Sequence, residues 1–158
     1  MNYFYNYLKS LNKSICIFID MDGVVADYDA VSYLKDKETI DVYKNKRPIK
    51  TTISILEKIS TLEHVELNIL SCTRNKNQID GKIKWLEEYM SFIKKERINI
   101  NSREEKNFAK AKDIKRDFLK EKENDSFIIL IDDSHEVIDE ILRLNSNILP
   151  LHISSILD

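Results

Sequence analysis

Short, wholly apolar runs alternate along this chain with longer segments in which apolar residues recur every three or four positions. The apolar runs are rich in isoleucine and predict buried strands, whereas the periodic segments predict amphipathic helices. The predicted strands lie at 15–19, 65–70, 97–100, 127–131 and 147–153, and the predicted helices at 3–11, 50–62, 79–90, 103–121 and 134–144. Pro150 lacks a backbone donor, which favours an edge position for the last strand.

The alternation of strands and helices predicts an α/β fold, in which helices cover both faces of an open, mainly parallel sheet. We expect a single domain that spans residues 1–158. Residues 28–49 do not fit this alternation, because they are rich in Tyr, Lys and Asp and are too long for a simple turn. A small cap or lid insert at about 28–49, over the end of the first strand, is therefore predicted.

The composition limits the classes of partner. Charged residues make up 33% of the chain, hydrophobic residues 42%, and the net charge is −2, so there is no overall positive field for nucleic acid. No apolar run approaches the roughly 20 residues of a membrane-spanning helix, and the first residues lack a signal-peptide pattern.

Cys16 and Cys72 are expected to be reduced and to fill space in the interior. We expect a cytoplasmic protein without a membrane partner. The oligomeric state stays open.

Acidic and hydroxyl side chains follow three of the predicted strands. Asp20 and Asp22 follow the first, Ser71 ends the second, and Asp132 and Asp133 end the fourth. Ligands of open parallel sheets bind beyond the carboxyl ends of the strands, so these groups should meet in one crevice. Carboxylates that lie close together repel one another, and a hard divalent cation such as Mg²⁺ removes that cost. The pattern predicts a site for a metal ion and a phosphate group.

These motifs resemble those of the haloacid dehalogenase (HAD) superfamily. "DMDGVVAD" (20–27) is similar to its first motif, D-x-D-G, and most of all to the version in 5′(3′)-deoxyribonucleotidases. "NILSCTRN" (68–75) resembles the second motif, and "FIILIDD" (127–133) the fourth, in which a strand ends on paired aspartates. The resemblance implies a HAD-like (Rossmannoid) three-layer sandwich with a mainly parallel sheet and a small cap insert.

The resemblance also implies roles for the acidic residues. Asp20 would attack phosphorus and form an aspartyl-phosphate, and Asp22 would act as general acid and then as general base. Mg²⁺ would be held by Asp20, by the backbone carbonyl of Asp22 and by Asp132, with Asp133 assisting. Ser71 would bind a phosphoryl oxygen.

The third motif of the superfamily is a lysine, and "NFAKAKDIKRDF" (107–118) and its neighbourhood offer several. Lys110 ranks first, because Ile114 and Phe118 follow it at helical steps, and Lys112 ranks second. Lys106 and Lys115 are the further candidates. Arg74, three residues after Ser71, is a possible contact for a substrate phosphate or base.

The leading functional hypothesis is a Mg²⁺-dependent phosphatase of HAD type that acts on a small phosphate ester, and specifically a 5′-nucleotidase for (deoxy)nucleoside monophosphates. Tyr28, Tyr33 and Tyr43 lie in the insert beside Lys46 and Arg47, a combination that suits a base attached to a phosphate. The alternatives are a polynucleotide 3′-phosphatase, which would act on a nucleic acid end, and a general small-molecule phosphatase. Outside the enzymes they are a degenerate HAD fold that only binds and a phosphoacceptor module of the receiver type; the order of the acidic motifs disfavours the latter.

Overall fold

The computed structural model of the chain describes residues 2–28, 42–123, 126–144 and 146–157. The strands are β1 (Ile15–Ile19), β2 (Val65–Thr73), β3 (Ile98–Ser102), β4 (Phe127–Asp132) and β5 (Ile148–His152). The α-helices are α1 (Tyr3–Ser10), α3 (Lys50–Ile59), α4 (Ile79–Tyr89), α5 (Ala111–Lys122) and α6 (His135–Leu142). Short 3₁₀ turns, η1 (Lys76–Gln78), η2 (Lys95–Arg97), η3 (Glu104–Lys106) and η4 (Ile153–Ile156), join or follow them.

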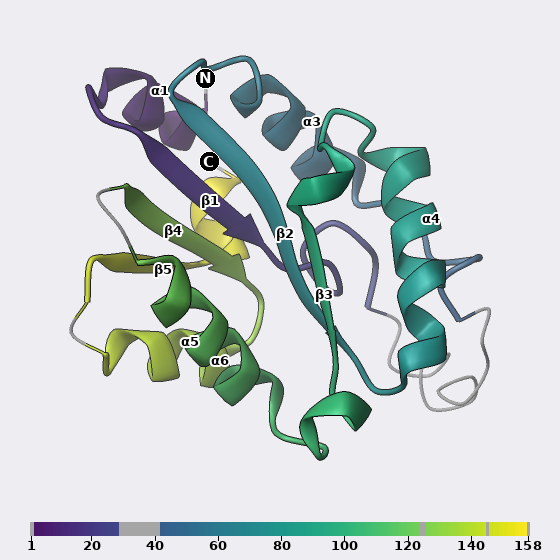
Figure 1. Cartoon of the computed structure of the whole chain (residues 1–158). Helices are drawn as coiled ribbons and strands as arrows, with labels where there is room; N and C mark the ends of the chain where they lie inside the picture. The colour runs from purple at the N-terminus through teal and green to yellow at the C-terminus, as the bar shows by residue number, and fades with distance from the viewer. Residues whose placement is uncertain (1, 29–41, 124–125, 145, 158) are drawn as a thin grey trace.

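The strands form one parallel sheet in the order β3-β2-β1-β4-β5 (Figure 1). The central strand β1 pairs with β2 on one side and with β4 on the other, so Ile19 lies beside both Ile69 and Ile131. The five predicted strands and their parallel arrangement are confirmed, and β5 with Pro150 lies at an edge as expected.

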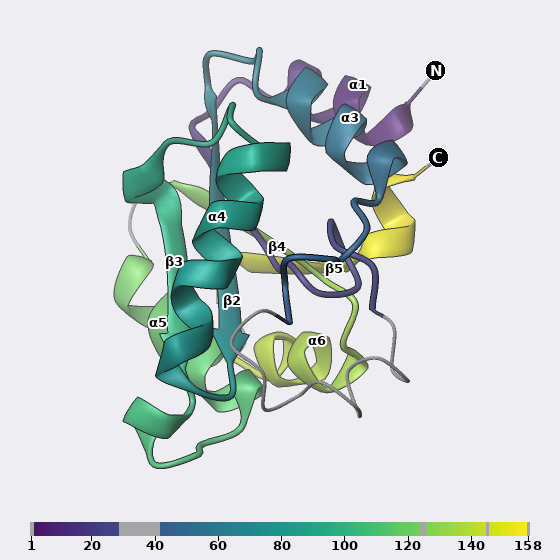
Figure 2. The ribbon, with the colours of Figure 1, turned by 90° about the vertical axis from the view of Figure 1, so that its right-hand side faces the viewer.

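Helices cover both faces of the sheet, as Figures 1 and 2 show. One core lies under α1, α3 and α4 and includes the fully buried Leu8, Leu56 and Ile17. A second core lies under α5 and α6, where Leu119 and Ile141 pack on side chains from β1, β2 and β4. Because the central strands are covered on both faces, their sequences are continuous apolar runs and do not alternate between apolar and polar residues.

The insert predicted at 28–49 is described only at its two ends, since residues 29–41 lie outside the described part of the chain. At its carboxyl end, the amide of Asp27 donates to the carbonyl of Arg47 (2.8 Å), and the amide of Ile49 donates to the carbonyl of Val25 (2.7 Å). These bonds hold residues 47–49 against the loop that follows β1. Whether the insert acts as a cap stays a prediction.

Two predicted elements differ from the structure. The helix expected at 103–121 begins only at Ala111, because the chain first forms the turn η3 and then passes through Asn107 and Phe108 with positive φ angles of 51° and 56°. The guanidinium group of Arg103 donates to the carbonyl of Ala109 (2.9 Å) and holds this turn. Strand β2 continues three residues beyond the predicted 65–70, which brings Ser71 inside the strand.

Both cysteines are free thiols, as expected, although each is only partly buried. Within the described ranges, no helix combines the length and the apolar character needed to cross a membrane.

Candidate active site

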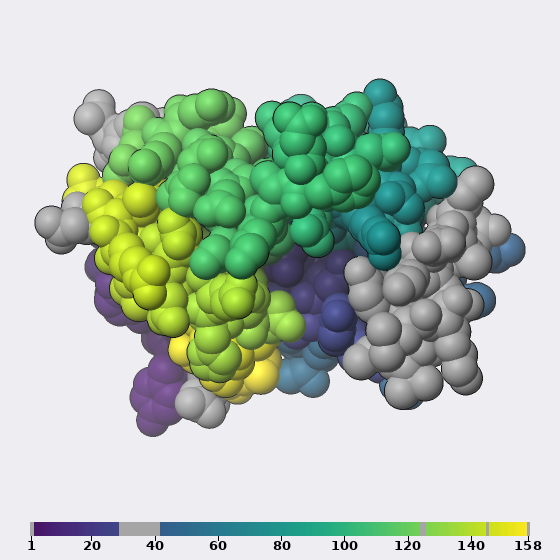
Figure 3. Space-filling view, turned by 90° about the horizontal axis from the view of Figure 1, so that it is seen from below, coloured from purple at the N-terminus to yellow at the C-terminus, as the bar shows by residue number. Residues whose placement is uncertain are grey.

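Three neighbouring strands deliver the predicted acidic and hydroxyl groups to one edge of the sheet. Asp20 follows β1 directly, and its amide donates to the carbonyl of Ile131 in β4 (2.9 Å). This bond sets Asp20 level with Asp132, the last residue of β4, while Ser71 lies in β2 on the other side. When the molecule is viewed from this edge, its surface has a hollow next to α5 and α6 (Figure 3). The floor of the hollow has the purple-blue colour of the segment around the end of β1.

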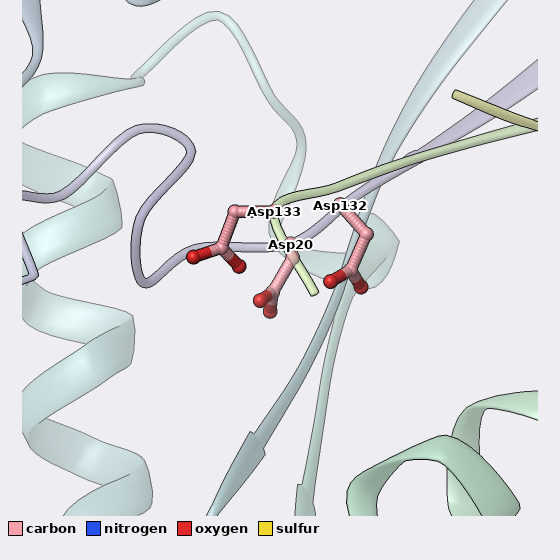
Figure 4. Close-up of side chains that lie close together, drawn as sticks. All are labelled: Asp20, Asp132 and Asp133. Atoms are coloured by element: carbon pink, nitrogen blue, oxygen red, sulfur yellow. The ribbon is translucent and has the colours of Figure 1, made fainter. Parts of the chain in front are cut away.

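Asp20, Asp132 and Asp133 form a carboxylate triad. One oxygen from each lies within 4.8 Å of the others, and Figure 4 shows the three side chains close together at the ends of β1 and β4. Burial and the charge of Asp20 raise the pKa of both Asp132 and Asp133 above the usual range. Such crowding of carboxylates is costly without a cation. The three oxygens are the donor set that a hard divalent cation prefers, so these residues could hold one.

Ser71 lies at the centre of the site and is 1% exposed. Its hydroxyl donates to Oδ1 of Asp20 (2.8 Å) and accepts a hydrogen bond from Nζ of Lys82 (2.7 Å). The structure therefore places Ser71 beside Asp20, and a phosphate-binding role for its hydroxyl stays a prediction.

Lys115 occupies the position beside the triad for which Lys110 was the leading candidate. Its ammonium group donates to Oδ2 of Asp132 (2.6 Å) and lies 3.1 Å from Oδ1 of Asp20, and its side chain is 3% exposed. Lys110 instead is exposed and precedes α5 as its N-cap. Lys112 lies 3.9 Å from Glu140, and both Lys110 and Lys112 line a small hollow of about 190 Å³. The structure thus brings neither Lys110 nor Lys112 to the aspartates.

The shifted start of α5 explains this difference. With the helix beginning at Ala111, the buried face carries Ile114, Lys115 and Leu119. The available signal was a lysine that directly follows Ile114 and lies four residues before Leu119. The prediction used a helical stripe that starts at Lys110, and this stripe does not include Lys115. Lys110 itself lies before the first residue of the helix.

Lys82, on α4, is a site residue that the sequence analysis did not identify. Its side chain is fully buried, and its ammonium group donates to Oδ2 of Asp22 (2.7 Å), Oγ of Ser71 (2.7 Å) and the carbonyl of Cys72 (2.9 Å). Burial opposes the charged form, yet the charge of Asp22 raises the pKa of Lys82 above its usual value. The signal was its position three residues after Ile79 and four before Leu86, on the buried stripe of the helix.

Asp22 is bound to two lysines and lies outside the carboxylate triad. Its Oδ1 accepts from Nζ of Lys46 (2.6 Å), and its Oδ2 from Lys82. Burial raises the pKa of Asp22, but the charges of Lys82 and Lys46 outweigh burial and lower it to about 2. The carboxylate is therefore ionised in this arrangement. Its backbone carbonyl stays a predicted metal ligand.

Gly23 gives the loop after β1 its shape. Its φ angle is +79°, and a Cβ at this position would overlap the carboxylate of Asp133. The amides of Val24, Val25 and Ala26 then converge on the carbonyl of Met21 (3.3, 3.0 and 2.9 Å). The glycine thus lets the chain turn while Asp133 keeps its place in the triad.

The remaining candidates lie at the margin. Arg74 is exposed on the loop that follows β2. Tyr43 is 5% exposed and belongs to the core, whereas Tyr28 is 50% exposed. Tyr33 lies outside the described residues.

The parallel sheet in the order β3-β2-β1-β4-β5, the helices on both faces and the acidic groups at the strand ends define an α/β protein with a HAD-like (Rossmannoid) fold. Among solved structures, the crystal structure of a class C acid phosphatase from Bacillus anthracis with tungstate bound is similar, with a TM-score of 0.51 and 21% sequence identity. The match covers 78% of this chain and 54% of the other, so this chain spans about half the length of that structure.

At the level of sequence, the family described as "Trematode PH-like domain" matches residues 46–147. By this sequence match the chain belongs to that family. Within the matched residues, β2, β3 and β4 belong to one parallel sheet and alternate with helices. No curated protein matches the chain.

Replacing Lys115 with Met should lower the free energy of unfolding by about 3 kcal/mol in metal-free buffer, because two buried carboxylates lose their shared cation. Addition of Mg²⁺ should restore part of this loss, since a dication can take over the neutralisation. Urea denaturation with chelator and with Mg²⁺ measures both effects. Lys112→Met is the matched control, with an expected loss below about 1 kcal/mol for a partly exposed ion pair. Equal losses in the two variants would contradict the assignment of Lys115.

Replacing Gly23 with Ala should weaken divalent-cation binding, because the added methyl group displaces Asp133 and the backbone conformation costs about 1–2 kcal/mol for a residue with a Cβ. Titration calorimetry with Mg²⁺ measures the affinity of Gly23→Ala, Asp133→Asn and the double variant. If Gly23 acts through Asp133, the double variant should bind Mg²⁺ about as weakly as Asp133→Asn alone. Fully additive losses would show that the two residues act independently.

Proposed function

We propose that this chain is a phosphatase that depends on a divalent cation, Mg²⁺, and hydrolyses phosphomonoesters through an aspartyl-phosphate on Asp20. The observation that carries the proposal is the environment of Asp20: its carboxylate accepts from Ser71 (2.8 Å) and lies 3.1 Å from the ammonium group of Lys115, beside Asp132 and Asp133. A nucleophilic carboxylate flanked by donors for phosphoryl oxygens is what such a transfer requires.

The fold supports this proposal by analogy. The similar structure is described as an acid phosphatase with tungstate bound, and tungstate is a tetrahedral oxyanion like phosphate. Because one fold can host unrelated activities, the analogy raises the plausibility of a phosphatase without determining the substrate. The argument from the residues around Asp20 stands beside it.

The carboxylate triad fits a hard cation, with Asp20, Asp132 and Asp133 as oxygen donors. When bound, the cation would neutralise the triad and polarise a phosphoryl oxygen. The chain itself would supply the orientation: the hydroxyl of Ser71 and the ammonium group of Lys115 both lie next to Oδ1 of Asp20 and would hold the other phosphoryl oxygens.

In the first proposed step, a carboxylate oxygen of Asp20 attacks phosphorus, the bond from phosphorus to the ester oxygen breaks, and the leaving oxygen takes a proton from Asp22. In the second step, water attacks phosphorus, gives its proton to Asp22 and releases inorganic phosphate and the free carboxylate of Asp20. The ionised Asp22 seen here suits the second step as a base. To carry a proton in the first step, Asp22 has to lose one of its two lysine contacts as the substrate enters.

For the substrate, we propose a nucleoside monophosphate, with residues 28–49 acting as a cap within a single domain of residues 1–158. The exposed ring of Tyr28, 5.6 Å from Nζ of Lys46, supports this choice, because an aromatic face beside a cation suits a base attached to a phosphate. Tyr43 adds no support, since it is buried in the core.

A phosphate-release screen tests the proposal. It should include nucleoside monophosphates, sugar phosphates, p-nitrophenyl phosphate and 3′-phosphorylated oligonucleotides, each with Mg²⁺ and with chelator. We expect release from phosphomonoesters only with the cation, and the highest kcat/KM for nucleotides. Release from no phosphomonoester would refute the phosphatase, whereas a preference for sugar phosphates or oligonucleotide ends would refute only the nucleotidase.

Asp20→Asn should reduce turnover of p-nitrophenyl phosphate to less than about a tenth of the wild-type value, because it removes the nucleophile and leaves side-chain volume almost unchanged. The urea midpoint should not fall, since the change also relieves repulsion with Asp132 and Asp133. Asp113→Asn is a control, because Asp113 on α5 pairs with Arg116 away from the triad. A tenth or more of wild-type turnover in Asp20→Asn would exclude Asp20 as the nucleophile.

A further inference from the structure

The site holds three lysines, and one of them, Lys82, has no donor left for a ligand. An ammonium group has three N–H donors. Lys82 uses all three, for Asp22, Ser71 and the carbonyl of Cys72, and its side chain is fully buried. Lys82 therefore has a fixed position and a complete set of partners.

Lys46 differs from Lys82 in both respects. Its side chain is 11% exposed, and its ammonium group makes one short hydrogen bond, to Oδ1 of Asp22 (2.6 Å). The second contact, to the carbonyl of Asp27, is long at 3.4 Å. Lys46 thus lies at the rim of the site with donor capacity that it does not use fully.

The backbone around Lys46 is held in place, so the position of its side chain is built into the fold. The indole nitrogen of Trp85, on α4, donates to the carbonyl of Lys46 (2.9 Å). The next residue, Arg47, accepts from the amide of Asp27 (2.8 Å). The carboxyl end of the insert is thereby fixed between α4 and the loop after β1, and the ring of Tyr43 lies 5.3 Å from Nζ of Lys46.

The charges at the site give Lys46 a further role. Four carboxylates gather here, and Lys82 and Lys115 neutralise two of them. A divalent cation would bring the net charge of these four carboxylates and two lysines only to zero. The phosphate group of a phosphomonoester carries about two negative charges at neutral pH. Among the described residues that contact these carboxylates, Lys46 supplies the surplus positive charge. The residues involved are Asp20, Asp22, Asp132, Asp133, Lys46, Lys82 and Lys115.

We propose that Lys46 is a substrate-binding residue, whose ammonium group donates to an oxygen of the phosphoryl group when substrate enters, and that the carboxylate of Asp22 holds this ammonium group in the meantime. This inference rests on the proposed phosphatase function and deepens it. It makes the carboxyl end of the insert part of the site, and it leaves Asp22 with Lys82 alone once substrate is bound.

The test measures binding of inorganic phosphate in the presence of Mg²⁺ by titration calorimetry, together with kcat and KM for p-nitrophenyl phosphate. Lys46→Met should weaken phosphate binding by at least about tenfold, the usual effect of losing a hydrogen bond to a charged group, and should raise KM more than it lowers kcat. Lys46→Arg keeps the charge and should stay within about threefold of wild type. Lys44→Met, an exposed lysine two residues earlier, should change nothing.

A purely structural role for Lys46 predicts a different result: Lys46→Met would lower the urea midpoint while the folded protein bound phosphate within about twofold of wild type. That outcome would overturn the inference and leave the phosphatase standing. If the wild type released phosphate from no ester, the proposed function would fail. The calorimetric comparison would still decide the role of Lys46, since it requires no turnover. A wild type that binds no phosphate would refute both.

Discussion

The candidate site depends on a chain of alternating charges that runs across the ends of three strands. Each acidic group in this chain of charges is held by a buried or nearly buried ammonium group. The hydroxyl of Ser71 joins the two halves of the chain of charges. Removing one of the buried lysines, Lys82 or Lys115, would leave carboxylates without their cation in a place where water hardly reaches them, which is costly. From contact to contact, the order in this chain of charges is Lys46, Asp22, Lys82, Ser71, Asp20, Lys115 and Asp132.

Sheet topology makes this chain of charges possible. With β1 between β2 and β4, the residue that follows β1 has a neighbour from another strand on each side, and the parallel direction puts all three strand ends at the same edge. Helices α4 and α5 lie over opposite faces of the sheet, so Lys82 and Lys115 reach Asp20 and its partners from opposite sides. An antiparallel arrangement of the same strands would separate these groups.

The strands and their acidic ends could be predicted from the sequence, because buried parallel strands appear as short apolar runs and the residue after each run is polar. The lysines could not be ranked in the same way. A lysine in a helix is usually solvated, and Lys115 and Lys82 differ from the others only in lying on the apolar stripe. Finding that stripe requires the correct helix start, and the turn with positive φ at Asn107 and Phe108 has no clear sequence signal, since neither residue is glycine.

The two lysines on Asp22 also bear on how the proposed reaction would be controlled. An aspartate that serves as acid and base has to exchange a proton, yet a carboxylate between two ammonium groups holds none. Lys82 cannot leave Asp22 without breaking its bonds to Ser71 and Cys72, whereas Lys46 has only one short bond to lose. Any change that prepares Asp22 for proton transfer is therefore easiest at Lys46. Because Lys46 lies at the carboxyl end of the insert, it is also the residue through which a cap could affect the chemistry at Asp20.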